Sequence, residues 1–145
     1  MHHVKASSVI DAPIEHIWTI VRDFGAIADW LPGTRGCQVE GDADRIGAIR
    51  RLDMGDAGII HEQLLGLSDA EHRVDFAITE SALPISGYQA TIQLLPVSDG
   101  NRTFISWSAR FEAAPEHAAE MTARMPRDIY QPAFDTLKQR FATRN

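Results

Sequence analysis

The chain has 145 residues, of which 44% are hydrophobic and 23% charged, with a formal net charge of −6 and a pI near 5.4. These values are ordinary for a globular protein, and we expect residues 1–145 to form a single domain. An acidic chain lacks the positive surface that binds nucleic acid or anionic membranes, and no apolar run approaches the roughly 20 residues of a membrane helix. The lone Cys37 excludes an internal disulfide and the first residues lack a secretory signal, so we expect a cytoplasmic protein.

The first quarter of the chain predicts one strand and two short helices. Weak alternation predicts a strand over 3–10. Asp11 can cap a helix that begins at Ala12 and Pro13, since proline is common at the first helical position. A second short helix is expected over 24–31.

Six further strands are expected in the middle of the chain. An Asp-Gly turn at 99–100 is a strong hairpin signal, and it opposes Ile92 to Trp107. Four residues further along, the same register opposes Tyr88 to Phe111. The expected strands cover residues 37–41, 47–54, 58–67, 72–80, 88–97 and 102–113.

From residue 115 to residue 142 the apolar residues recur at helical spacing. Pro126 and Pro132 are expected to kink or divide this helix. Its apolar stripe consists of Ala118, Met121, Met125, Ile129, Ala133, Leu137 and Phe141. A curved antiparallel sheet needs its concave face covered, and this helix is the obvious cover. The sequence therefore predicts an α+β protein: a curved seven-stranded antiparallel sheet around a long C-terminal helix, with two short helices after the first strand.

Two charged residues fall in step with apolar residues of neighbouring strands in GAIRRLDMGDAGIIHEQLLGL. Arg50 shares a strand face with Leu52, and Glu62 shares one with Ile60. If the GDA stretch forms a three-residue hairpin loop, Leu52 opposes Ile60. The same register places Arg50 opposite Glu62, with Cβ atoms about 4.5–5.5 Å apart. An unpaired charge in an apolar setting is costly, so we expect the two side chains to pair and to face inward.

This pair admits a structural and a functional interpretation. It could be an ion pair that satisfies itself within the sheet. Alternatively, Arg50 could polarise a ligand carbonyl or hold an anionic oxygen while Glu62 moves a proton. The small inward residues Ala48, Ala90 and Ala109 would leave room for a cavity beneath the helix.

Four aromatic residues are candidate ligand contacts in such a cavity. Tyr88 could donate a hydrogen bond from its hydroxyl or be an aromatic core residue. Trp107 is expected in the cavity wall or the core, and Phe76 lies on the inward face of its strand. Trp30 could line the entrance or serve packing. Glu80 could lie at the cavity rim or at a solvated strand end.

No motif indicates a metal or a nucleotide cofactor, and we expect neither. His61 and Glu62 begin like the zinc motif HExxH, but HEQLL lacks the second histidine and lies on a strand pattern. His16 and His72 are isolated, and no glycine-rich phosphate loop precedes a helix. Cys37 has no partners that would make it a nucleophile, and we expect a buried thiol.

The order of elements, with IDAPIEHIWTIVRDFGAIADWLP near the start, resembles the START-like (SRPBCC) superfamily, whose fold is called helix-grip. The polyketide cyclase/dehydrase-like branch is the most similar, over essentially the whole chain. Within it, IWTIVRDFGAI, CQVEGD, GAIRRLDMG, HEQLLGLSD, GYQATIQLLP and ISWSARFE are similar to lachrymatory factor synthase. The resemblance implies that Arg50 and Glu62 line the cavity and act in catalysis, and that Tyr88 belongs to the pocket. The loops at 55–58 and 81–87 differ, so the substrate does not carry over.

Three functions remain open from the sequence. The first is a cofactor-independent cyclase, dehydratase or isomerase that acts on a small hydrophobic, carbonyl-bearing molecule. The second is a non-catalytic carrier or sensor of a hydrophobic ligand, in which Arg50 anchors the head group. The third is a protein-interaction module. We expect a small hydrophobic ligand as partner and neither nucleic acid nor membrane, and a homodimer is compatible with the sequence. The first two functions need Glu62 to be buried beside open volume.

Overall fold

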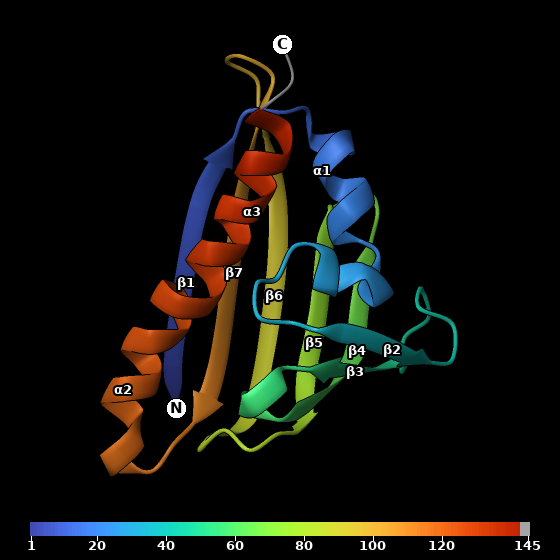
Figure 1. Ribbon diagram of the computed structural model, residues 1–145. Helices are drawn as coiled ribbons and strands as arrows, with labels where there is room; N and C mark the ends of the chain where they lie inside the picture. Colours follow the sequence, from blue (N-terminus) through green and yellow to red (C-terminus); the bar gives the residue numbers. More distant parts are fainter. Residues whose placement is uncertain (143–145) are drawn as a thin grey trace.

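The computed structural model describes residues 1–142 and shows a curved sheet that wraps around the C-terminal helix (Figure 1). Within these residues, seven antiparallel strands form one sheet in the order β1-β7-β6-β5-β4-β3-β2. This arrangement confirms the predicted α+β helix-grip fold. The strands are β1 (His2–Ile10), β2 (Gly36–Glu40), β3 (Ile49–Asp53), β4 (Ile59–Ser68), β5 (Arg73–Glu80), β6 (Ser86–Val97) and β7 (Arg102–Glu112).

Two short helices follow β1, as predicted: the α-helix α1 (Ile14–Val21) and the 3₁₀ helix η1 (Phe24–Asp29). Pro13 occupies the N-cap position of α1, and no side chain caps its first turn. The prediction that Asp11 caps this helix is therefore wrong. Asp11 lies two residues before the N-cap, too early in the chain to take the place from which a capping side chain reaches the free N–H groups.

The C-terminal helix is interrupted between its two internal prolines, Pro126 and Pro132. Its parts are α2 (Pro115–Met125), the π-helical turn η3 (Pro126–Tyr130) and α3 (Gln131–Ala142). A helical proline lacks the N–H that would donate to the carbonyl four residues earlier, and its ring crowds that carbonyl; for Pro132 this carbonyl belongs to Asp128, inside η3. The turn widens instead, and the first N–H of α3 donates to the carbonyl of Pro126. Pro132 lies inside α3 without ending it. None of the helices described is long and apolar enough to cross a membrane.

The β3–β4 hairpin has the predicted register, with Arg50 opposite Glu62. The turn between the strands is the short 3₁₀ helix η2 (Gly55–Ala57), which matches the expected three-residue loop. Gly58 closes this turn with φ 92° and ψ −161°. Only glycine adopts that backbone conformation readily, so the turn fixes the register through a residue without a Cβ atom.

The predicted β6–β7 register is confirmed along most of the hairpin. It shifts between Ser86 and Gln89, the interval that contains Tyr88, so the predicted pairing of Tyr88 with Phe111 is not part of the regular ladder. An irregularity of this kind changes the direction of neighbouring side chains. Tyr88 is buried, and its hydroxyl reaches Tyr130 in η3.

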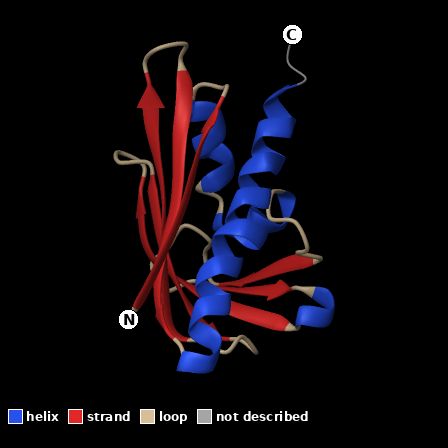
Figure 2. Cartoon of the chain, turned by 90° about the vertical axis from the view of Figure 1, so that its left-hand side faces the viewer, coloured by secondary structure: helices blue, strands red, loops and turns tan. Residues whose placement is uncertain are grey.

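The hydrophobic core lies between the concave face of the sheet and the helices, which Figure 2 shows as two layers seen from the side. Aromatic side chains make up much of it, because a single helix must fill a wide concave surface. The largest fully buried side chains include Trp30, Tyr130, Phe24, Phe76, Phe111 and Phe134.

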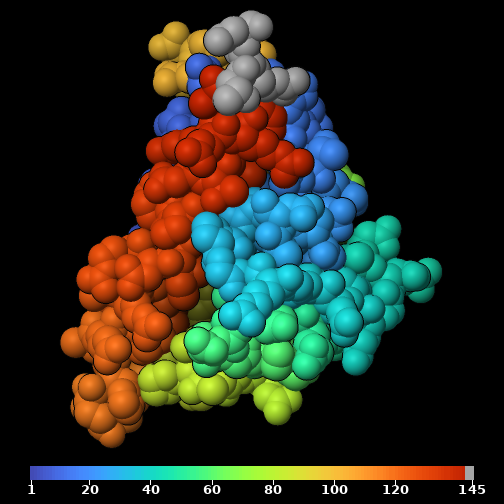
Figure 3. All heavy atoms as spheres, in the orientation of Figure 1, coloured from blue at the N-terminus to red at the C-terminus, as the bar shows by residue number. Residues whose placement is uncertain are grey.

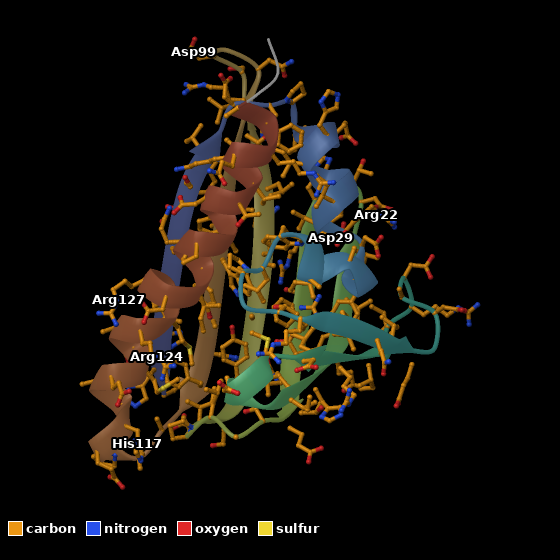
Figure 4. All side chains as sticks on the ribbon, in the orientation of Figure 1. Arg22, Asp29, Asp99, His117, Arg124 and Arg127 are labelled. Carbon is orange, nitrogen blue, oxygen red and sulfur yellow. The ribbon has the colours of Figure 1, made fainter. Side chains whose placement is uncertain are left out.

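Polar contacts fasten α1 to the turn between β4 and β5. Asp69 accepts hydrogen bonds from Nε1 of Trp18 and Nε of Arg22, both at 2.8 Å. These two donors hold the pKa of the Asp69 carboxyl below its usual range. Arg22 extends from the outer side of α1 (Figure 4), so this contact lies at the surface and closes one end of the sheet.

Candidate functional site

Arg50 and Glu62 form a buried ion pair between β3 and β4. Only 4% of the Arg50 side chain and 8% of the Glu62 side chain are exposed. Nε of Arg50 donates to Oε1 of Glu62 at 2.8 Å. Nη2 lies 2.6 Å from the same oxygen but is not oriented to form a hydrogen bond with it. Both nitrogens therefore approach one carboxylate oxygen.

Further contacts fix the guanidinium group of Arg50. Its Nη1 donates to the backbone carbonyl of Phe24 at 3.1 Å. Its central carbon lies 4.0 Å from the ring centre of Phe24 and 4.7 Å from that of Phe76. A cation stacked between two rings and bonded to a carboxylate has little freedom to turn towards another partner.

The second oxygen of Glu62, Oε2, accepts no hydrogen bond within the described part of the chain. Glu62 lines a pocket between the sheet and the C-terminal helix, and it is the only charged residue among the described residues that do so. Arg50 is not part of this lining, so of the two charged residues predicted to line a cavity, Glu62 is the one in contact with this pocket. A fixed carboxylate with one free oxygen beside an apolar pocket is suited to accept a proton.

The pocket has a volume of about 50 Å³. Three of its described lining residues carry polar side-chain atoms: Glu62, Tyr88 and Trp107. The other nine are aliphatic: Ile27, Leu31, Leu52, Met54, Ile60, Ile78, Leu83, Met125 and Ile129. A volume of this size holds about one or two water molecules. Most of the open volume that the small residues of the sheet were expected to leave is therefore absent.

One side of the pocket faces the surface of the protein. Five of its aliphatic residues are only partly buried: Met54, Ile60, Ile78, Leu83 and Ile129. In Figure 3 the surface is hollowed between the orange residues of α2 and the green residues around η2. The pocket therefore lies behind a shallow notch between the C-terminal helix and the β3–β4 turn.

Tyr88 and Tyr130 meet beside this pocket, with 2.6 Å between their hydroxyl oxygens. The ring of Tyr130 stacks on Trp107, with ring centres 4.4 Å apart and 14° between the planes. Burial raises the pKa of both tyrosines, although the hydrogen bond from Tyr130 acts in the opposite direction on Tyr88. Both hydroxyls are therefore protonated at neutral pH. Tyr130 is absent from the residues predicted from sequence, because regular helical spacing places Ile129 on the apolar stripe instead.

Two of the predicted aromatic contacts lie outside the pocket. Trp30 is 2% exposed and packs behind Trp107, with ring centres 5.9 Å apart, so it serves packing and does not line an entrance. Phe76 contacts Arg50 on one side and Trp107 on the other. It belongs to the support of the ion pair.

Nε1 of Trp30 and Nε1 of Trp107 are buried without a well-formed hydrogen bond among the described residues, although Trp107 acts on the Tyr88 hydroxyl strongly enough to lower the pKa of Tyr88. An unpaired buried N–H is unfavourable, and native structures contain few of them. Because Trp107 lines the pocket, an oxygen atom of a bound molecule could satisfy its donor.

The remaining polar candidates are not part of the pocket. Glu80 is exposed at the end of β5 and lies 3.5 Å from His61, which makes it a solvated strand end. Cys37 is half-buried, not buried as predicted, because its strand β2 is at the edge of the sheet. Burial raises the pKa of its thiol. The described residues contain no cluster of side chains that could hold a metal ion.

A larger hollow of about 600 Å³ lies on the outer face of the sheet. Its polar side chains are bonded to one another: Asp75 receives hydrogen bonds from Arg73 and Thr91, and Gln89 receives one from Arg110. This hollow offers no buried polar group, and it lies on the opposite face of the sheet from Glu62. We therefore place the candidate site at the smaller inner pocket.

Solved structures share this fold. The protein XoxI from Bacillus cereus has a TM-score of 0.88 and 24% identity, over 99% of this chain and 97% of that one. A protein from Nitrosospira multiformis has a TM-score of 0.80 and 26% identity, over 98% and 97%. Norcoclaurine synthase from Thalictrum flavum, in complex with dopamine and hydroxybenzaldehyde, has a TM-score of 0.78 and 16% identity, over 99% and 88%. Similarity at this level of identity shows a common fold.

The sequence also matches a protein family. No curated protein matches the chain. The family described as polyketide cyclase / dehydrase and lipid transport matches residues 1–142, which is nearly the whole chain. That family agrees with the branch indicated by the sequence motifs and with the helix-grip fold. The chain is therefore a member of the polyketide cyclase / dehydrase and lipid transport family.

Proposed function

We propose that the protein binds a small hydrophobic molecule with a carbonyl group and catalyses proton transfer on it without a cofactor. The observation that carries this proposal is the free oxygen of Glu62, Oε2, at a pocket whose other described lining residues are uncharged. The family description supports a ligand of this kind. So does the fold shared with norcoclaurine synthase, which was solved in complex with dopamine and hydroxybenzaldehyde.

In the proposed reaction Glu62 is the base. Its Oε2 takes a proton from the carbon next to the ligand carbonyl; the electron pair of that C–H bond forms a carbon–carbon double bond, and the π pair of the carbonyl moves to its oxygen. The hydroxyl of Tyr88 donates a hydrogen bond to this oxygen as it becomes negative. Return of the proton to a different carbon gives isomerisation. Attack of the enolate carbon on a second carbonyl of the same molecule closes a ring, and loss of water from that product gives dehydration.

Arg50 has a positioning role in this proposal. It occupies Oε1 of Glu62, which leaves Oε2 as the oxygen available to the ligand. Phe24 and Phe76 hold the guanidinium group in place, so the carboxylate keeps one orientation. A base held in one orientation needs no rearrangement at the moment of reaction.

The pocket must enlarge to admit a ligand, because sites for drug-sized molecules measure about 300–1,000 Å³. Met54, Leu83 and Ile129 lie on its partly exposed side. These side chains could move outward together with α2, which precedes the widened turn η3. The pocket would then extend to the surface notch in Figure 3.

Deuterium exchange tests this function directly. Enolisable ketones and polyketide-like aromatics are incubated with the protein in D₂O, and binding is measured in parallel by native mass spectrometry. We expect Glu62→Gln to reduce exchange at the carbon next to the carbonyl by about 10²–10⁴-fold, the usual contribution of a general base, while binding changes only a few-fold. Glu80→Gln, at an exposed carboxylate on the neighbouring strand, is the matched control and should change neither.

Each other outcome has a defined meaning. Binding without exchange by the unmodified protein would favour a carrier or sensor. Exchange that Glu62→Gln leaves unchanged would contradict the assignment of the base. Failure of every compound to bind would contradict the proposal as a whole.

A further inference from the structure

The hydroxyl of Tyr130 lies between two acceptors. It is 2.6 Å from the hydroxyl oxygen of Tyr88 and 4.0 Å from Sδ of Met125. Each hydroxyl has one proton to donate and two lone pairs to accept with, so the group has two arrangements. In the first, Tyr88 donates to Tyr130, which donates to the sulfur. In the second, Tyr130 donates to Tyr88, and the proton of Tyr88 is free.

Only one of the two tyrosines can touch a ligand. Tyr88 lines the pocket, whereas Tyr130 is fully buried behind it and is not part of the lining. Tyr130 is held in place by the stack on Trp107 and by the widened turn at whose end it lies. Any effect of Tyr130 on a ligand must therefore pass through Tyr88.

We propose that Tyr130 is a positioning residue that makes Tyr88 a stronger hydrogen-bond donor to a ligand oxygen, an inference that rests on the proposed function. When such an oxygen enters the pocket, Tyr88 donates to it. Tyr130 then turns its proton from Met125 to Tyr88. No O–H bond breaks in this change. Negative charge that develops on the ligand oxygen is shared by two hydroxyls in series, and hydrogen bonds in series strengthen one another.

This arrangement favours one class of ligand. A carbonyl oxygen that gains negative charge during the reaction is matched by the two hydroxyls in series and by the base Glu62, which also lines the pocket. A ligand that offers only N–H or O–H donors gains less, because Tyr88 then has no acceptor in the pocket for its proton.

The pair can be tested without any ligand, because the chain has two tyrosines and both belong to it. Biosynthetic replacement by 3,5-difluorotyrosine makes the phenols much more acidic, so that they titrate while the protein is folded. Phenolate absorbance is followed against pH in the otherwise unmodified protein and in Tyr130→Phe and Tyr88→Phe, which keep one labelled residue each. Circular dichroism confirms that each protein is folded. Glu62 and Arg50, the charged groups that act on Tyr88, are the same in all three proteins.

We expect the protein with both hydroxyls to release its first proton at a lower pH than either variant, by about one unit or tenfold in the ionisation constant. The reason is that the remaining hydroxyl donates to the phenolate. A first ionisation in either variant within a few tenths of a unit of that in the pair would overturn the inference.

A second variant removes the competing acceptor. Met125→Leu conserves volume and takes away the sulfur, so the Tyr130 proton has Tyr88 as its remaining partner. We expect the first ionisation to stay where it is or to move to lower pH. A rise to the value of Tyr130→Phe would overturn the inference. Neither titration requires a ligand, so the outcome for the tyrosine pair does not depend on the ketone assay. The titrations can support the pair when the ketone assay fails, and they can contradict it when the ketone assay succeeds.

Discussion

Replacement of Arg50 by methionine should destabilise the protein by about 3–4 kcal/mol. The substitution removes the hydrogen bond and close contact to Oε1 of Glu62, the bond to the carbonyl of Phe24, and the cation between two rings. Removing one partner of a buried ion pair costs about 3–5 kcal/mol, because the other charge stays buried without compensation. Methionine is flexible and apolar and restores part of the contact with Phe76, which favours the lower half of that range.

Thermal and urea unfolding followed by far-UV circular dichroism measure this loss. For a domain of this size, about 2–4 °C is lost per kcal/mol, so the midpoint should fall by roughly 6–16 °C. Arg127→Met is the matched control. Arg127 pairs with Asp128 on the exposed side of the C-terminal helix (Figure 4), and exposed pairs contribute little to stability. If Arg50→Met unfolded at the same midpoint as this control, the buried and paired state of Arg50 and Glu62 would be refuted.

A double substitution separates the charge from the packing. Arg50→Met combined with Glu62→Leu removes both charges, and apolar replacement of a whole buried pair is often neutral or stabilising. We therefore expect the double variant to be more stable than Arg50→Met alone. A further loss of stability would mean that packing, not the uncompensated carboxylate, accounts for the effect of the single change.

Three further predictions concern pH and the backbone. The raised pKa values of Tyr88 and Tyr130 mean that the pair contributes stability below about pH 10, the pKa of an unfolded tyrosine, and that this stability is lost as the pH rises further. Phenolate absorbance should thus appear together with loss of circular dichroism, and its appearance in the folded protein well before that point would contradict the burial of the pair. The lowered pKa of Asp69 contributes stability above about pH 4, and this stability is lost as the pH falls. The melting temperature of Asp69→Asn should therefore fall less steeply with acidification than that of the unmodified protein. The same dependence of melting temperature on pH in both proteins would count against the contact with α1. Gly58→Ala should lower the free energy of unfolding by about 1–3 kcal/mol, because an L side chain is strained in the backbone conformation of that turn. Gly36→Ala is the control and should be close to neutral, because Gly36 has no positive φ and a Cβ atom there would meet open space. Equal unfolding free energies of the two variants would contradict the predicted strain at Gly58.

The pairing of Arg50 with Glu62 could be predicted because the length of the hairpin loop sets the register, and hydrophobic matching indicates which loop length is present. A side-chain period of two means that a shift of one residue moves every side chain of a strand to the other face. With a three-residue loop, Leu52 meets Ile60 and apolar residues match apolar ones; with a two-residue loop they would meet polar residues. Hydrophobic matching therefore identified the register, and the structure has it.

Tyr130 and the size of the pocket could not be predicted in this way. Ordinary helical spacing selected Ile129, which is partly exposed, and passed over Tyr130, because it does not include the wider turn that follows Pro126. The volume left beside Glu62 depends on how side chains from several strands, η1 and the C-terminal helix fit together. No pattern within a single element contains that information. Asp11 failed as a cap for a related reason, since the pattern located the helix but not its first residue.

The widened turn η3 has a consequence for how the length of this protein can change. Successive residues of an α-helix are rotated by about 100°, so Met125 and Ala133 would point about 80° apart in a regular helix. The π-turn accommodates one additional residue, which reduces that angle to about 20°, and both side chains are buried. A chain with one residue fewer here, and without the prolines that interrupt the helix, could therefore form an uninterrupted helix that still buries both. Helices rarely tolerate a change of length. At η3, the turn that carries Tyr130, a change of one residue would still leave Met125 and Ala133 facing the core. Insertion and deletion at this turn could thus alter the helix wall beside the pocket during evolution while the rest of the core is kept.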